Sequence, residues 1–323
     1  MSDRQYTYAV ARIRAKEVSL FSQATLDQLL ACSDEQQCLQ FLVERGWGDA
    51  DASLDVESIL ACEREKTWEL MRELIEDMSV LDVLTYSDLF HNLKAAVKQV
   101  TTNEKFDNIF IPDTKISGEE MMEYIKAKEF GRFPDNMAHV AQEAYETLLH
   151  TGDGQLCDVI IDQATLKAIY EAGKASKEEI IKQYAESTVA VANIKIAVRS
   201  QKTAKSIEFM TKSMAECDTL NIRALAQAAL SGAEAIQAYL ESTAYAEGAE
   251  ALAESPSAFE CWCDNEIIRT IRPQIYNPFG IGPLVAYAIA RENEIKTVRI
   301  ILSGKTSDLS EESIRERVRD MYV

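Results

Sequence analysis

The chain has 323 residues, 47% of them hydrophobic, and carries a net charge of −19 at pH 7. An acidic surface repels nucleic-acid phosphates and anionic lipid headgroups, so the composition argues against either as a direct partner. Only 12 glycines and 6 prolines are present, whereas the strong helix formers Ala, Glu, Leu, Gln and Lys are abundant. We therefore expect an all-α protein.

The N-terminus and the cysteines predict an intracellular chain. Residues 1–6 lack the basic cluster and apolar run of a signal peptide, and no stretch approaches the roughly 18–20 apolar residues that cross a bilayer. The seven cysteines are scattered at spacings that match neither a zinc site nor a CxxC motif. We expect a soluble chain with reduced thiols and no direct membrane insertion.

Helix starts are marked by the pattern Ser/Thr-x-x-Glu/Gln, whose first side chain can cap the free amides of a first turn. The pattern occurs at Thr25–Gln28, Ser33–Gln36, Ser117–Glu120, Ser176–Glu179 and Ser257–Glu260. Apolar residues at helical spacing indicate helices with one buried face; they include Trp68, Met71, Ile75 and Met78, and later Phe90, Leu93, Val97 and Val100.

The segment 273–283 is the only dense Pro/Gly stretch, and it predicts a structured turn. We expect a long helix after it. Glu292 and Lys296 are four residues apart in that helix, a spacing that favours an ion pair between them.

A seven-residue helical phrase, here called the repeat phrase, occurs three times at intervals of about one hundred residues. All copies have an Asn, a Val and a terminal cation at the same offsets: Asn92, Val97 and Lys98; Asn193, Val198 and Arg199; Asn293, Val298 and Arg299. Each copy of a sequence repeat is one structural unit. We therefore expect three pseudo-repeated helical lobes, at residues 1–107, 108–216 and 217–323.

Two interpretations of the repeat phrase are open. In the structural one, the Asn and the cation tie neighbouring lobes together or cap adjacent helices, while the Val faces the core. In the functional one, Lys98, Arg199 and Arg299 line a cavity and meet a partner protein.

Three further arginines, Arg315, Arg317 and Arg319, lie close together near the C-terminus. They are expected to form a solvated basic face near a helix C-terminus, where cations are favoured. The alternative is a contact with an acidic partner surface.

The remaining motifs argue against chemistry in this chain. Gly304-Lys305-Thr306 resembles the end of a phosphate-binding loop, but the glycine required five residues earlier is replaced by Arg299. The three histidines lie far apart in the sequence and have no metal-binding context. We predict no catalytic residue, no cofactor and no metal.

Both ends of the chain resemble the C subunit of the vacuolar/archaeal-type rotary ATPases, a relative of the d subunit of the eukaryotic proton pump. Near the N-terminus the resemblance rests on Tyr6–Ala15 and Phe41–Gly48. Near the C-terminus it rests on Phe279–Gly280, Pro283–Tyr287, Glu292–Lys305 and Ile314–Val323. The middle, roughly residues 100 to 180, is diffuse.

The resemblance implies a three-lobed helical funnel with pseudo-threefold symmetry. In that family the protein is a socket and spacer that passes torque between the rotating central stalk and the membrane proteolipid ring. It implies a non-catalytic part of an ATP-hydrolysing or ATP-synthesising complex that moves protons or sodium ions. It also implies a peripheral position on the cytoplasmic face of the membrane, held through protein contacts.

The alternative from another class is a free-standing helical repeat scaffold, and an enzyme is a more distant third. Co-purification with a rotary ATPase separates the first two. If the coupling role holds, removal of the tail from Ile314 onward should weaken assembly more than it lowers helix content.

Overall fold

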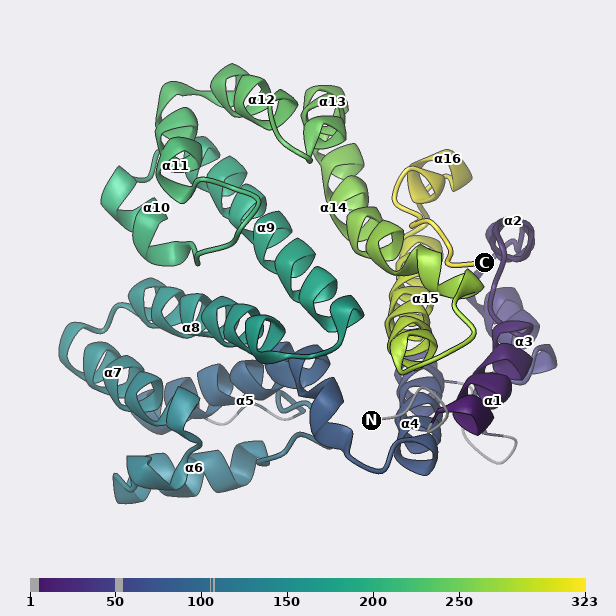
Figure 1. Ribbon diagram of the computed structural model, residues 1–323, viewed down its shortest axis with the longest axis horizontal. Coiled ribbons are helices and arrows are strands. Elements are labelled where there is room, and N and C mark those ends of the chain that lie inside the picture. The colour runs from purple at the N-terminus through teal and green to yellow at the C-terminus, as the bar shows by residue number, and fades with distance from the viewer. Residues whose placement is uncertain (1–5, 50–54, 105, 107) are drawn as a thin grey trace. The chain divides into compact units, whose positions relative to one another are not determined.

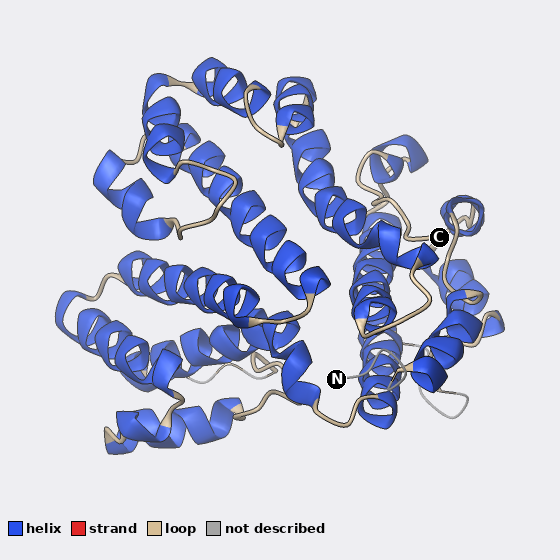
Figure 2. Cartoon of the chain, in the orientation of Figure 1, coloured by secondary structure: helices blue, strands red, loops and turns tan. Residues whose placement is uncertain are grey.

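The computed structural model describes residues 6–49, 55–104, 106 and 108–323. Every regular element in these ranges is a helix, which confirms the all-α prediction (Figure 2). The helices, labelled in Figure 1, are α1 Thr7–Glu17, α2 Gln23–Leu30, α3 Glu35–Glu44, α4 Val56–Leu74, α5 Asp82–Thr102, α6 Gly118–Ala127, α7 Asp135–Thr151, α8 Gly154–Ala175, α9 Glu179–Lys202, α10 Ile207–Ser213, α11 Ile222–Ser231, α12 Ala233–Glu241, α13 Ala246–Glu254, α14 Pro256–Ile271, α15 Gly282–Thr306 and α16 Glu311–Arg315. Three short 3-10 turns, η1 Met78–Leu81, η2 Phe130–Arg132 and η3 Arg272–Tyr276, connect them.

The chain forms two compact units. Unit 1 contains residues Met1–Ser79, Glu178–Ile180 and Ala246–Val323, and unit 2 contains Val80–Lys177 and Ile181–Tyr245. The three-lobe division stays a prediction. Its boundary at residue 107 falls outside the described residues, and so do residues 1–5 of the segment on which the prediction about a signal peptide rests.

In unit 1 the two ends of the chain share one hydrophobic core. Helix α15 packs against α1, α3, α4, α14 and α16, and every residue from 281 to 290 is buried. Side chains from α2, α3 and α4 meet α15 in this core, among them Leu29, Leu42, Leu60, Val298 and Leu302. A helix that is apolar around its whole circumference is stable only when it is enclosed. Helix α15 is therefore the central element of unit 1.

Unit 2 has its own core. Helices α5, α6, α7 and α8 pack around Phe90, Leu93, Met121 and Ile161, and α10 and α11 continue the packing from α8. Helices α8 and α9 approach closely at Gly173, where an added Cβ would lie 2.3 Å from the Cβ of Ala185. The glycine permits this contact because it has no side chain.

One of the five expected capping patterns forms the full capping box. At the start of α6, Ser117 accepts a hydrogen bond from the Glu120 amide and Glu120 accepts one from the Ser117 amide. The cap lies one to three residues from the predicted one in three other places: Ser22 caps α2, Asp34 caps α3 and Ser255 caps α14. Ser176 instead ends α8. At α2, α3 and α14 the predicted cap differs from the observed one because another Ser or Asp nearby also fits a cap.

The Pro/Gly segment between η3 and α15 is an ordered turn. The Arg14 guanidinium donates to the carbonyls of Gln274 and Asn277, both at 2.6 Å. At Gly282 an added Cβ would lie 2.0 Å from the Gln274 side-chain oxygen. A side chain at this position would therefore displace the side chain of Gln274 from the start of α15.

Candidate functional site: three asparagine clamps

The first two asparagines of the repeat phrase bind the backbone of the segment that follows their own helix. On α5, Asn92 donates to the Ile111 carbonyl at 2.8 Å and accepts from the Ile111 amide at 2.8 Å. On α9, Asn193 does the same to Ala215, at 2.7 and 3.0 Å. Both asparagines are 0% exposed. We call this pair of hydrogen bonds between an Asn side chain and the amide and carbonyl of one residue an asparagine clamp.

The third copy divides the same task between two asparagines. On α15, Asn293 donates to the Asp320 carbonyl at 3.0 Å. The amide of Asp320 donates to Asn265 of α14 at 2.9 Å. The backbone of one residue is again held on both sides, here at the C-terminus of the chain. Asn265 could not be found from the repeat, because it lies outside the repeat phrase.

The other two shared positions of the repeat phrase, the valine and the cation, differ in burial. Val97, Val198 and Val298 are all buried. Lys98 forms an ion pair with Asp158 of α8 at 2.6 Å, and Arg299 pairs with Glu57 of α4. Arg199 is exposed on α9. The contacts of the asparagines and valines support the structural interpretation of the phrase.

The last residues of the chain are fastened to α14. We call residues 318–322 the C-terminal strap. Arg272 donates to the Met321 carbonyl at 2.6 Å, the Cys261 thiol donates to the Val318 carbonyl at 3.2 Å, and Arg319 pairs with Asp264 at 2.8 Å. The strap is therefore part of the packed body of unit 1.

Burial corrects the expectation for one of the three C-terminal arginines. Arg319 is 8% exposed, so it does not lie on a solvated face. Its charge is compensated by Asp264, which the helix-end argument did not consider. Arg315 and Arg317 are exposed as expected, and Arg315 pairs with Asp27 of α2 and with Glu311.

A buried ionic cluster, missed from the sequence, links α4 to α15. Arg291 pairs with Glu63 and Glu294, and its guanidinium carbon lies 5.1 Å from the centre of the Trp47 ring. Burial alone would lower the pKa of Arg291, but the surrounding carboxylates outweigh it and raise the pKa above its usual value. Burial raises the pKa of Glu294, opposed by Arg291 and by the amide of Phe21. The sequence signal for this cluster is the pair of opposite charges Arg291 and Glu294, which lie three residues apart directly after the apolar run 283–290.

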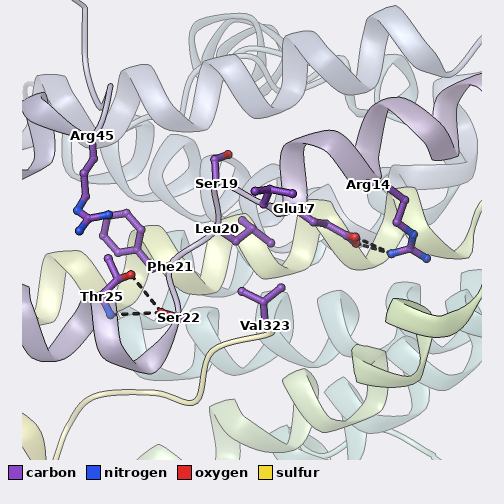
Figure 3. A pocket seen from close by; sticks show the side chains of 10 residues that line it. Arg14, Glu17, Ser19, Leu20, Phe21, Ser22, Thr25, Arg45 and Val323 are labelled. Carbon is purple, nitrogen blue, oxygen red and sulfur yellow. Dashed lines mark hydrogen bonds and ion pairs between the residues drawn. The ribbon is translucent and has the colours of Figure 1, made fainter.

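Among the described residues of unit 1, two of the open cavities are lined by residues of the sequence motifs. The first, about 630 Å³, is lined by Arg14, Glu17, Leu20, Phe21 and Val323 among others (Figure 3). It brings together the N-terminal and C-terminal family motifs, because Arg14 belongs to one and Val323 to the other. The second, about 540 Å³, lies between α14, α15 and α16, and Arg299, Arg317 and Arg319 contribute to its lining.

The remaining sequence motifs have structural roles. Lys305 donates to the carbonyls of Leu30 and Cys32, both at 2.6 Å, so its ammonium is used within unit 1. The expected pair of Glu292 and Lys296 does not form. Arg64 lies 3.0 Å from Glu292, and Lys296 pairs with Asp264 at 2.6 Å. Glu292 and Lys296 therefore each pair with a residue of a neighbouring helix and not with each other.

Within the described ranges, no group of three or more His, Cys, Asp or Glu side chains could hold a metal ion. No described helix is both long enough and apolar enough to span a bilayer.

These features define a class: an all-helical protein whose long helices hold returning backbone segments by buried asparagines. The model of the ATP synthase (C/AC39) subunit family matches residues 9–317, so the chain belongs to that family. The match confirms the family that both termini indicated.

Two curated relatives are similar over nearly the whole chain. The C subunit of the V-type sodium ATPase of Enterococcus hirae is 23% identical over 317 residues, covering 96% of this chain and 97% of the relative. The C subunit of the A-type ATP synthase of Methanocaldococcus jannaschii is 25% identical over 343 residues, covering 96% of this chain and 85% of the relative.

Proposed function

We propose that this chain is the non-catalytic central-axis subunit of a V/A-type rotary ATPase. In this role it is a socket and spacer between the rotating central stalk and the membrane proteolipid ring. It transmits torque between ATP chemistry and the transport of protons or sodium ions. It is peripheral on the cytoplasmic face and is held there through contacts with the other proteins of the complex.

The observation that carries the proposal is the family match over residues 9–317. Both relatives are named as the C subunit of a V-type or A-type enzyme, and each is covered over most of its own length. A match of this extent includes both units, so the argument does not depend on one shared motif.

The internal structure suits a part that transmits torque, because such a part must resist deformation. Close-packed interiors have low compressibility. Returning segments are fixed by buried clamps at Asn92, Asn193 and Asn293, and α4 is fixed to α15 by Arg291 and Glu63. A buried polar group cannot leave its partner without a desolvation cost, so these contacts oppose sliding between helices.

Co-purification tests membership of the complex. An affinity tag on this chain should recover the catalytic, stalk and proteolipid proteins of a rotary ATPase from detergent-solubilised membranes. The reciprocal tag, on a catalytic protein of the complex, should recover this chain at a fixed ratio. An intact, active rotary ATPase that lacks the chain would refute the proposal, and recovery of the chain alone would favour a free-standing scaffold.

Loss of the chain tests the coupling role. Without the spacer, membranes should lose ATP-driven ion uptake while the released catalytic head still hydrolyses ATP. Both rates are measured on the same membranes, and a plasmid copy of the chain should restore uptake. If uptake persists at the original ratio to hydrolysis, the chain does not couple them.

A charge reversal tests whether the basic side chains contact a partner. Arg317 is exposed and lines the second cavity, and Arg223 is an exposed arginine of unit 2. Arg317→Glu should lower recovery of the complex, whereas Arg223→Glu makes the same charge change elsewhere and should not. Equal recovery for both variants would remove Arg317 from the contact surface.

A further inference from the structure

Two cysteines, Cys32 and Cys38, lie close together at the turn between α2 and α3. The Cys38 thiol donates to the Leu29 carbonyl at 3.5 Å, and the backbone amide of Cys32 donates to the same oxygen at 3.3 Å. The side chain of Cys32 packs against the core cluster that contains Cys38. Both thiols are free. The Leu29 carbonyl thus binds both Cys32, in the turn after α2, and Cys38, in α3, while the Cys32 thiol donates to the Gln28 carbonyl at 3.6 Å.

The two thiols differ in access. Cys32 is partly exposed, whereas Cys38 is 0% exposed. Burial, followed by the charge of the Cys32 thiol and a hydrogen bond to it, raises the pKa of Cys38 to about 12, and Lys305 acts in the opposite direction. A reagent in solution can therefore reach Cys32 first, because the thiolate must be accessible to react.

We propose that Cys32 and Cys38 form a thiol–disulfide exchange site that reacts with small-molecule disulfides. Cys32 is the attacking thiol and Cys38 is the resolving thiol. This site is separate from the proposed function, and its chemistry does not depend on a rotary ATPase.

The exchange proceeds in two balanced steps through a mixed disulfide. The Cys32 thiolate attacks one sulfur of the small disulfide, breaks its S–S bond and releases one small thiolate, which takes up a proton. The Cys38 sulfur, after losing its proton, attacks Cys32 and releases the second small thiolate. The two protein thiols are oxidised to one disulfide, and the small disulfide is reduced to two thiols.

Lys305 supports the second step. Its ammonium group is fixed at the turn by the carbonyls of Leu30 and Cys32, at 2.6 Å each. A fixed positive charge favours the Cys38 thiolate against the effect of burial. The resolving thiol is thus assisted by a residue that also holds the end of α15 to the turn.

Oxidised glutathione is the probe, applied to the folded full-length chain. After alkylation of the remaining thiols, trypsin releases residues 17–45 between Lys16 and Arg45, a peptide whose only cysteines are Cys32 and Cys38. In the wild type this peptide should be lighter than its reduced form by two hydrogen atoms. In Cys38→Ala it should carry one glutathione on Cys32, and in Cys32→Ala it should be unmodified.

Cys157 is the matched control, because it is also 0% exposed and its pKa is raised by burial, to about 11, with no second thiol among the causes. It should remain reduced in the folded chain and react after urea denaturation. Circular dichroism verifies that each variant is folded, and Cys38→Ser replaces Cys38→Ala if the latter unfolds.

The proposal is overturned if folded wild type stays reduced, if it carries glutathione on Cys32 without the internal disulfide, or if Cys32→Ala reacts at Cys38 as fast as wild type.

Discussion

An asparagine side chain offers a donor and an acceptor like those of a peptide group, so it can bind both the carbonyl and the amide of one residue. Asn92 and Asn193 use this property inside the protein, where water cannot replace a lost partner. Aspartate has no donor for the carbonyl. The repeat phrase therefore retains asparagine for a geometric reason, while its cation at the surface alternates between lysine and arginine.

Removal of one clamp should be costly. Asn193→Ala leaves the amide and the carbonyl of Ala215 without their partner, and Ala215 is 3% exposed. We expect a loss of about 2–3 kcal/mol in the free energy of unfolding, measured by urea denaturation. Lys202→Ala, at an exposed position on the same helix, should change it by less than about 0.5 kcal/mol. An equally small change in Asn193→Ala would show that the clamp contributes little.

At the scale of elements, α16 can pack closely against α15 because Gly304 of α15 has no side chain. At Gly304 an added Cβ would lie 2.6 Å from Cγ1 of Ile314, which is 1% exposed. Gly304→Ala should therefore destabilise the protein by about 1–3 kcal/mol through overpacking. Gly154→Ala, with no atom within 4 Å, should be neutral or stabilising by up to about 1 kcal/mol. Thermal denaturation compares the two, and equal midpoints would contradict close packing of α16.

The capping box of α6 makes stability depend on pH. Hydrogen bonds from the amide and hydroxyl of Ser117 hold the pKa of Glu120 below its usual value of 4.5. A lowered folded-state pKa stabilises the fold fully above the ordinary value, and this contribution is lost as the pH falls below it. Glu120→Gln should therefore be less stable than wild type at pH 7, and the difference should shrink as the pH falls below 4.5. A difference that is constant with pH would exclude the ionised cap.

The elements could be predicted from the sequence better than their contacts. Composition and apolar spacing gave the all-α class, and the Pro/Gly stretch gave the turn before α15. Helix starts were displaced by a few residues, since Ser22, Asp34 and Ser255 compete with neighbouring residues for the cap. The clamp partners Ile111, Ala215 and Asn265 were not predictable. They come close to the repeat asparagines, or share their task, only in the folded chain.

At the scale of the whole molecule, each unit has its own core. All three tryptophans, Trp47, Trp68 and Trp262, belong to unit 1, so their fluorescence reports that unit alone. A unit with its own core can unfold as a separate transition. In Asn193→Ala, a variant of unit 2, we expect an earlier circular dichroism transition and an unchanged fluorescence midpoint. If both signals shift together, the units unfold cooperatively.

The family could be identified from the sequence because its motifs lie at the two ends of the chain. The structure shows that the N-terminal and C-terminal motifs, far apart in the sequence, lie together in unit 1. Arg14 and Val323 line one cavity, and the N-terminal helices share a core with α15. Segments that pack against each other constrain each other's sequence, whereas the diffuse middle of the chain packs mainly within unit 2.

The clamps also have a practical consequence for protein engineering. The asparagine precedes the residue whose carbonyl it binds by 19, 22 and 27 positions in the three copies. In all three copies the asparagine side chain donates to a backbone carbonyl although the length differs. The entropy of closing a loop grows only slowly with its length. Within the second and third stretches, the exposed residues 203–204 and 307–309 lie outside the packed helices α10 and α16. They are therefore permissive positions, where an epitope or a fluorescent reporter can be inserted without opening the body of the protein.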